Sequence, residues 1–275
     1  MALAAKIPYD HPYAGGFPGL GGQALPTDSD CLTYLAAVKA ADGAGVEVGV
    51  AVAVDAFFRD TKAAGVFDAL EACCILAGAR TLAGALVPVV GDAPTNVADG
   101  FAGGDYSRTD GLTGDGSTTY LDTGRPQNSD PQNDAHISVF ITASGTAASV
   151  RYAGTTDTSA GSYLLLYDDN SFTGAYVSSN SITDVSNRTG VNLVGGTRDS
   201  SSQQTARVDG VSNTTAVASI APTTLNSYVF CRNLNGSPNA FSDATIAFYS
   251  IGTSLSLEDL ETAVTNLINA IGEAL

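Results

Sequence analysis

From about residue 91 onward, apolar and polar side chains alternate in short runs. In the stretch 136–142, Ile137, Val139 and Ile141 occupy every second position. This period is that of a β-strand with one buried face. The other predicted strands are 149–154, 162–167, 174–178, 192–197, 204–209, 211–217, 227–232 and 244–250. Many short strands separated by Gly, Asn, Asp, Ser and Thr predict a mainly β fold, an antiparallel jelly-roll sandwich over 92–255.

One turn of this sandwich is predicted in detail. Asp209 and Gly210 separate two alternating runs. This dipeptide favours the two-residue type I′ hairpin, because both central residues of that turn need a positive φ. We therefore expect a hairpin that is closed at 209–210.

Before residue 91 the apolar spacing is three and four, which is typical of amphipathic helices. The predicted elements are a helix capped by Asp28 and ended by Gly43, a helix from Val46 that Gly65 follows, a short helix over 66–76, and an edge strand or extended connection over 81–90. Residues 29–91 are therefore predicted to form a small helical segment.

Residues 256–275 return to the helical period as a C-terminal amphipathic helix. Ser256 and Asp259 have the spacing of a capping box. The apolar stripe consists of Leu257, Leu260, Val264, Leu267 and Ile271. Such a stripe must be buried. Packing on the sandwich or on the helical segment is one interpretation, and a seam between copies in an oligomer is the other.

Residues 1–28 hold four prolines and several glycines. Proline and glycine at this density disfavour both helix and strand, so we interpret the segment as an extended docking arm. The residues expected to contact a partner surface are Tyr9, His11, Pro12, Tyr13 and Phe17.

The chain has 275 residues, with 28 Asp and Glu against 12 Lys and Arg, and a formal net charge of −16. This charge repels phosphate backbones and no basic stripe is present, so nucleic acid is not an expected partner. No apolar stretch approaches the roughly 18 residues of a membrane span, and the first residues lack the apolar core of a signal peptide. We expect neither membrane insertion nor secretion.

Cys73 and Cys74 are interpreted as small buried apolar residues.

The sequence carries no motif of a catalytic, metal or cofactor site. A sandwich glycosidase needs a pair of carboxylates, and all five glutamates fall on predicted helices. They are Glu47, Glu71, Glu258, Glu261 and Glu273. The two histidines are too few for a triad or a metal centre, and His136 is interpreted as a sheet or rim residue. The stretches 114–117 and 168–170 are interpreted as turns rather than calcium loops. We predict no enzyme and no cofactor.

Carbohydrate binding is better supported by the composition of the strands. Lectin-like sandwiches stack an aromatic ring on the apolar face of a sugar. The chain has no Trp, so tyrosines on or near the strands are the candidates. These are Tyr152, Tyr163, Tyr167 and Tyr176. The alternative for each is a place in the core or on the sheet face.

Three stretches of the chain together resemble a known type of module: 75–82, 114–124 and 231–238. The last of them leads to 246–252 and a final helix. They are similar to the concanavalin A-like, or laminin-G-like, sandwich modules of tailed-phage virion proteins. The resemblance covers roughly 46–275 and implies a rigid, non-enzymatic surface domain. It also implies a homo-oligomer, with a trimer as the expected form.

Two functional hypotheses follow. The first is a phage virion protein that decorates the capsid or forms a head or tail appendage, anchored to other virion proteins by residues 1–28. Its acidic charge favours the outer surface, because packaged DNA would repel it. The alternative is a receptor-binding module that recognises host surface polysaccharide through the sandwich.

Overall fold

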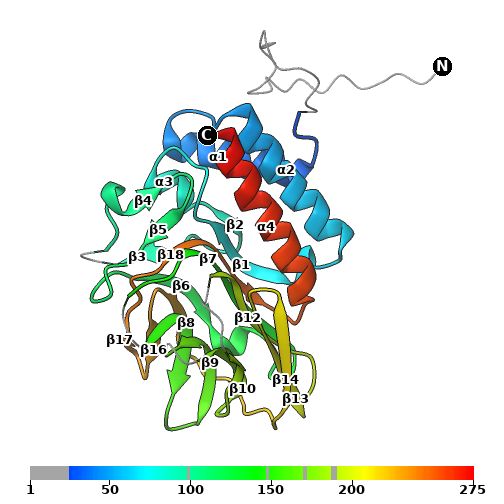
Figure 1. Ribbon diagram of the computed structural model, residues 1–275, viewed down its shortest axis with the longest axis vertical. Helices are drawn as coiled ribbons and strands as arrows, with labels where there is room; N and C mark the ends of the chain where they lie inside the picture. The colour runs from blue at the N-terminus through cyan, green and yellow to red at the C-terminus, as the bar shows by residue number, and fades with distance from the viewer. Residues whose placement is uncertain (1–24, 98–99, 147–148, 170–171, 187–190) are drawn as a thin grey trace, which may run out of the picture.

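Two antiparallel sheets pack face to face in the computed structural model (Figure 1). The structure describes residues 25–275 except 98–99, 147–148, 170–171 and 187–190. Sheet A has the strand order β14-β13-β12-β7-β18-β1-β2, with β5 and β4 continuing from β18. Sheet B has the order β11-β10-β9-β8-β15-β6-β3, and β16 and β17 extend it beside β8. The prediction of a mainly β sandwich with helices towards both ends of the chain is confirmed.

The strands of sheet A are β1 Leu70–Ile75, β2 Pro88–Val90, β4 Tyr106–Ser107, β5 Gly111–Thr113, β7 Ala135–Ala143, β12 Asn192–Arg198, β13 Gln203–Val208, β14 Val211–Ala216 and β18 Thr245–Gly252. The strands of sheet B are β3 Thr95–Asn96, β6 Leu121–Pro126, β8 Val150–Asp157, β9 Ser162–Asp168, β10 Phe172–Ser179, β11 Thr183–Ser186, β15 Asn226–Val229, β16 Arg232–Leu234 and β17 Ser237–Asn239. Every predicted strand from 136 to 250 overlaps one of these.

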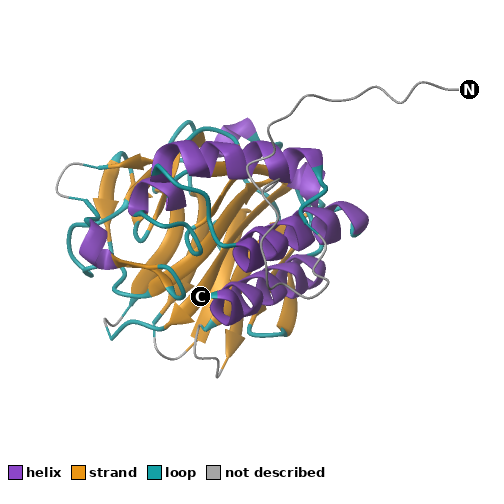
Figure 2. Cartoon of the chain, turned by 90° about the horizontal axis from the view of Figure 1, so that it is seen from above, coloured by secondary structure: helices purple, strands orange, loops and turns teal. Residues whose placement is uncertain are grey.

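In the described part of the chain, the helices lie on the outer face of sheet A (Figure 2). They are α1 Ser29–Asp42, α2 Val48–Ala63, the single-turn α3 Leu82–Ala85, and α4 Leu257–Ala274, with short 3-10 turns at Phe67–Ala69, Gly103–Asp105 and Gln127–Ser129. Asp28 caps α1 by accepting from the backbone N–H of Cys31, and Gly43 ends it with φ 74°. These local predictions are confirmed, because caps depend on a few neighbouring residues.

The molecule has two apolar cores. One lies between the two sheets, and the other lies between sheet A and the helices. The apolar stripe of α4 belongs to the second core, where Leu260, Val264 and Ile271 are fully buried against the rest of the chain. The stripe is therefore buried within one copy, and it is not the exposed seam that the oligomer interpretation required.

The predicted helix over 66–76 is wrong. Its first half contains the 3-10 turn, and Leu70–Ile75 is a strand between β18 and β2. Both faces of this strand are buried, with Cys73 in the helix-side core and Cys74 in the core between the sheets. A strand buried on both sides shows no alternation and reads like a short buried helix. The segment 29–91 is thus partly helical and partly an integral piece of sheet A.

The hairpin at 209–210 is confirmed. Asp209 and Gly210 have φ values of 47° and 76°, and they join β13 to β14 with Val208 paired to Val211. The positive φ at both positions is the requirement of a type I′ turn.

Candidate functional site

The outer face of sheet B, opposite the helices, carries a row of side chains from neighbouring strands. Tyr228 of β15 pairs with Gly154 of β8, Gly154 pairs with Leu165 of β9, and Leu165 pairs with Tyr176 of β10. Directly paired residues of antiparallel strands project to the same face. Because Leu164 and Leu166 point into the core between the sheets, Leu165 and the residues paired with it point outward.

Three tyrosines gather on this face. Tyr163 and Tyr167 flank Leu165 on β9, and Tyr176 lies on β10. The rings of Tyr163 and Tyr176 meet edge to face, with centroids 5.4 Å apart. All three side chains are partly exposed. They are among the residues that the sequence indicates for carbohydrate stacking, and the strand register brings them together; we name them the tyrosine face.

An arginine lies against the same tyrosines. The Arg151 guanidinium carbon is 3.8 Å from the centroid of the Tyr167 ring, which is a cation–π contact. Its Nη1 donates to the backbone carbonyls of Ser149 and Val150, and its buried Nε has no partner. The Tyr167 hydroxyl donates to Asp169 at 2.9 Å. The tyrosine face therefore combines ring surfaces, hydroxyls and a cation that is held mainly by carbonyl groups.

A second arginine increases the positive charge there. Burial, and the like charge of Arg232 on β16, which pairs with β8, lower the pKa of Arg151 to about 10. Among the described residues, neither Arg151 nor Arg232 forms a salt bridge with Asp or Glu, although most other described arginines do. The tyrosine face therefore carries two arginines without an ion pair among the described residues, together with the Asp169 carboxylate that accepts from Tyr167.

The fourth predicted tyrosine, Tyr152, does not belong to this surface. It is 2% exposed in the core between the sheets, and its hydroxyl donates to Asp168 at 2.9 Å. The register of β8 shifts between Arg151 and Ala153. This bulge leaves Arg151 on the outer face and turns Tyr152 inward, so its ring is not available for stacking on a ligand.

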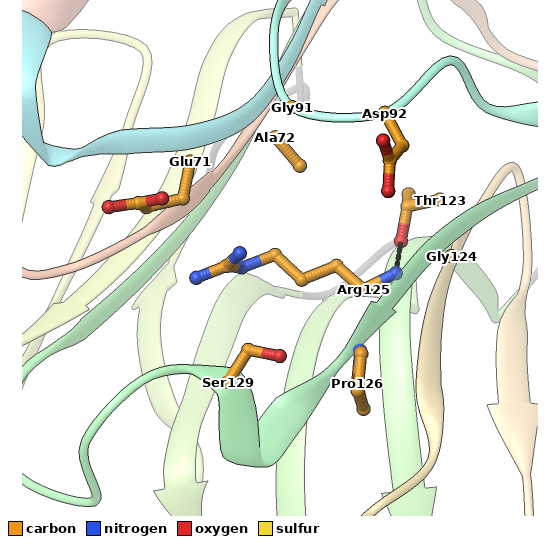
Figure 3. Close-up of a pocket in the computed structure, with 9 residues that line it drawn as sticks. All are labelled: Glu71, Ala72, Gly91, Asp92, Thr123, Gly124, Arg125, Pro126 and Ser129. Atoms are coloured by element: carbon orange, nitrogen blue, oxygen red, sulfur yellow. Dashed lines mark hydrogen bonds between the residues drawn. The ribbon is translucent and has the colours of Figure 1, made fainter.

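A separate polar pocket of about 300 Å³ lies where β1 and the end of β2 face β6 (Figure 3). It is lined by Glu71, Ala72, Gly91, Asp92, Thr123, Gly124, Arg125, Pro126 and Ser129. Figure 3 shows the Arg125 side chain extending across the hollow, with Glu71 and Asp92 above it and Ser129 and Pro126 below it. Glu71 lies on strand β1, so the expectation that every glutamate falls on a helix is wrong at this position.

The charge of the pocket is already partly satisfied within the chain. Arg125 makes two contacts with Asp130, at 2.6 Å and 3.2 Å, and the Asp130 side chain is 2% exposed. The Thr123 hydroxyl donates to the carbonyl of Ser227. A cation that is neutralised by a buried carboxylate attracts an anionic ligand weakly, so the tyrosine face is the stronger candidate site.

The stretch 114–117, which the sequence indicates to be a turn, is held by the side chain of Asp115. Asp115 accepts hydrogen bonds from the backbone N–H groups of Ser117, Thr118 and Thr119, as a residue that organises a turn does. Burial raises its pKa, but these bonds and that of the Thr118 hydroxyl outweigh burial and lower it. Tyr9, His11, Pro12, Tyr13 and Phe17 lie outside the described residues.

No clustered acidic or histidine site appears among the described residues, where no three His, Cys, Asp or Glu side chains gather around one point. Within the same residues, no helix is long and apolar enough to cross a membrane. His136 is a fully buried sheet residue that faces the helices.

No model of a known protein family matches the chain, and no curated protein sequence does. Among solved structures, it is similar to the NanB sialidase of Streptococcus pneumoniae, with a TM-score of 0.41, 10% identity, and coverage of 52% of this chain and 26% of the sialidase. The chain is also similar to the CBM40 domain of the Ruminococcus gnavus IT-sialidase, solved with α2,3-sialyllactose. Here the TM-score is 0.38 and the identity 14%, over 48% of this chain and 82% of the CBM40 chain. For domains LG4-5 of the mouse laminin α1 chain, the TM-score is 0.31 and the identity 14%, over 46% of this chain and 37% of the laminin chain.

These similarities are confined to part of the fold. The chain spans about a quarter of the length of the sialidase chain, and all three TM-scores are below 0.5. None of the three is named as a virion protein.

Proposed function

We propose that the protein binds a saccharide on the tyrosine face. The observation that carries this proposal is the meeting of Tyr163, Tyr167 and Tyr176 beside Arg151 on the side of the sandwich that no helix covers. Partly exposed tyrosine rings offer an apolar surface to the C–H groups of a sugar, while their hydroxyls offer hydrogen bonds to its oxygens. The side chains lose little conformational entropy when a ligand binds, because rings packed on a sheet are already held in place.

The charge of the tyrosine face favours an acidic saccharide. Arg151 and Arg232 lie close together without an ion pair to a described carboxylate. A carboxylate or sulfate group on the sugar would relieve their mutual repulsion by charge-assisted hydrogen bonds to the guanidinium groups. Binding of such a ligand is expected to weaken as ionic strength rises.

The direct test is an array of acidic and neutral glycans probed with the full chain, followed by calorimetry on a retained glycan. We expect Tyr176→Ala to weaken binding about tenfold, since one stacked ring contributes about 1.4 kcal/mol. Tyr176→Phe keeps the ring and should retain most of the affinity. Thr214→Ala on the exposed strand β14 is the control for a change outside the site. If no glycan is retained, or if Tyr176→Ala binds as tightly as the original chain, the proposal fails.

Attachment to a virion stays a prediction of the sequence resemblance. The described chain just before α1 is held within the molecule: the backbone N–H groups of Thr27 and Asp28 both donate to Asp55 of α2 at 2.8 Å. Lys62 of α2 also bridges Asp28 and Asp30. The chain that leads into the first helix is thus fastened to the second helix.

Deletion of residues 1–24 tests the docking role and leaves these fastening contacts in place. We expect the shortened protein to fold, with an unchanged melting temperature, and to be lost from phage particles assembled in its presence. Retention of the shortened protein on particles at the original level would rule out docking by this segment. Quantitative immunoblotting of purified particles measures the outcome.

A further inference from the structure

A second group of aromatic side chains lies at the β6 and β15 end of sheet B. Tyr120, just before β6, and Tyr228 of β15 have ring centroids 4.8 Å apart, and Phe241 is 6.2 Å from Tyr120. Tyr120 and Phe241 are partly exposed, whereas Tyr228 is largely covered by its neighbours.

This group lies on the same face as the tyrosine face. Leu121 points into the core between the sheets, so its neighbours Tyr120 and Asp122 point outward. Asp122 pairs with Tyr228, which begins the row that continues through Gly154 and Leu165 to Tyr176. The cross-strand register therefore places the two aromatic groups at opposite ends of one outward-facing row.

Polar groups accompany the second aromatic group as they accompany the first. The Asp122 carboxylate accepts from the side-chain amide of Asn226, at 3.1 Å, and from the backbone N–H of Gly124. Asp122 and Asn226 are both partly exposed. A fixed amide and carboxylate next to partly exposed rings can hydrogen-bond the hydroxyls of a sugar that stacks there.

We infer that these two groups form one extended surface for a linear saccharide chain that runs across the strands from β6 and β15 to β10. This inference rests on the proposed function and adds the length of the ligand to it. Tyr228 and Tyr176 are separated by three strand intervals, roughly 14 Å, which is longer than a single sugar ring. Gly154 and Leu165 lie between them in the row and are both buried, so a ligand would contact the two aromatic groups and not these two residues.

The charge at the β9 and β10 end of the surface agrees with an acidic sugar, whereas the Asp122 carboxylate at the β6 and β15 end suits a hydroxyl donor. Arg151 and Arg232 lie near Tyr176, where both lower the pKa of that tyrosine against the larger effect of burial, which raises it. An acidic polymer presents a charge at every repeat, so one repeat can meet the arginines while others stack on the rings. The two aromatic groups then act as linked contacts for one ligand, and affinity grows with ligand length.

The experiment measures the affinity of the full chain for polygalacturonate oligomers from two to eight residues by calorimetry. For the original chain we expect affinity to rise at least about tenfold between the shortest and the longest oligomer. Tyr120→Ala should remove most of that rise and leave binding of the shortest oligomer unchanged. Tyr176→Ala should weaken binding at every length, and Tyr120→Phe should restore the length dependence.

The outcomes separate the two proposals. Affinity that does not depend on length, or a Tyr120→Ala variant whose length dependence is intact, would overturn the extended surface alone. A Tyr120→Ala variant that loses binding equally at all lengths would also contradict it, because that pattern indicates a purely structural ring. Phe241→Ala alters the same aromatic group, and its length dependence should also be reduced. If the original chain binds none of these oligomers and no glycan of the array, the proposed function itself fails.

Discussion

Phe248→Ala is expected to lower the free energy of unfolding by about 3–5 kcal/mol, the cost of emptying a well-packed aromatic site. Phe248 is 0% exposed on strand β18 and belongs to the core between sheet A and the helices. Its ring meets that of Phe57 of α2, with centroids 5.7 Å apart. The substitution therefore removes a contact between the sheet and the helical layer.

Equilibrium denaturation followed by circular dichroism measures this effect. Signals from helix and strand should shift together, because the helices share their core with sheet A. Val211→Ala, at an exposed position of β14, is the matched control and should change stability by less than about 0.5 kcal/mol. Separate transitions for helices and sheets would show that the helical layer is an independent unit, contrary to this packing.

Acidification should destabilise the protein through His136. Burial is the main cause that lowers the pKa of this side chain from 6.5 to about 4. Between these values the unfolded chain binds the proton and the folded chain does not. The contribution of His136 to the free energy of unfolding is therefore fully present above pH 6.5 and is lost as the pH falls towards 4. A shift of this size corresponds to about 3 kcal/mol.

Burial keeps His136 neutral against the backbone hydrogen bonds, which raise its pKa, and the hydrogen bonds decide which ring nitrogen carries the proton. Nδ1 lies 2.6 Å from the carbonyl of Thr253, which can only accept, so Nδ1 carries the proton. Nε2 then accepts from the hydroxyl of Ser250 at 2.9 Å. Ser250 in turn contacts Ser138 at 2.7 Å. A second proton on the ring would turn Nε2 into a donor and reverse the direction of this chain of bonds, and it would place a charge in a fully buried site.

His136→Gln separates this effect from the titration of surface carboxylates. The variant has no group that titrates near neutral pH at this position, so its stability should fall less between pH 6.5 and pH 4.5 than that of the original chain. The difference between the two unfolding curves, measured by urea denaturation at each pH, isolates the contribution of His136. Parallel pH profiles would show that this histidine is not the responsible group.

Much of the fold could be predicted because its signals are local. The Asp28 cap and the hairpin at 209–210 need only adjacent residues. Strand β1 was missed because both of its faces are buried. Strand β6 was missed for another reason: its sequence contains Gly124 at φ 68° and ends at Pro126, residues that resemble a loop more than a strand.

The candidate site could be predicted only in part. Tyr163 and Tyr167 are four residues apart on one strand, so alternation alone puts both on the same face. Tyr152 broke this rule because the bulge before Ala153 is invisible in the sequence. Arg151 and Arg232 carry no motif, and they reach the tyrosines through strand pairing rather than through spacing along the chain. Long-range register is the information that a single sequence lacks.

The placement of the helices gives the molecule two different ends. Leu275 and the start of α1 lie on the helical side, while β8, β9 and β10 lie at the opposite end in Figure 1. A copy that is tethered through either end of its described chain would therefore hold its tyrosine face away from the point of attachment. Many such copies on one support would bind a repeating polymer by avidity, so even a weak contact by each copy would add up to firm adhesion.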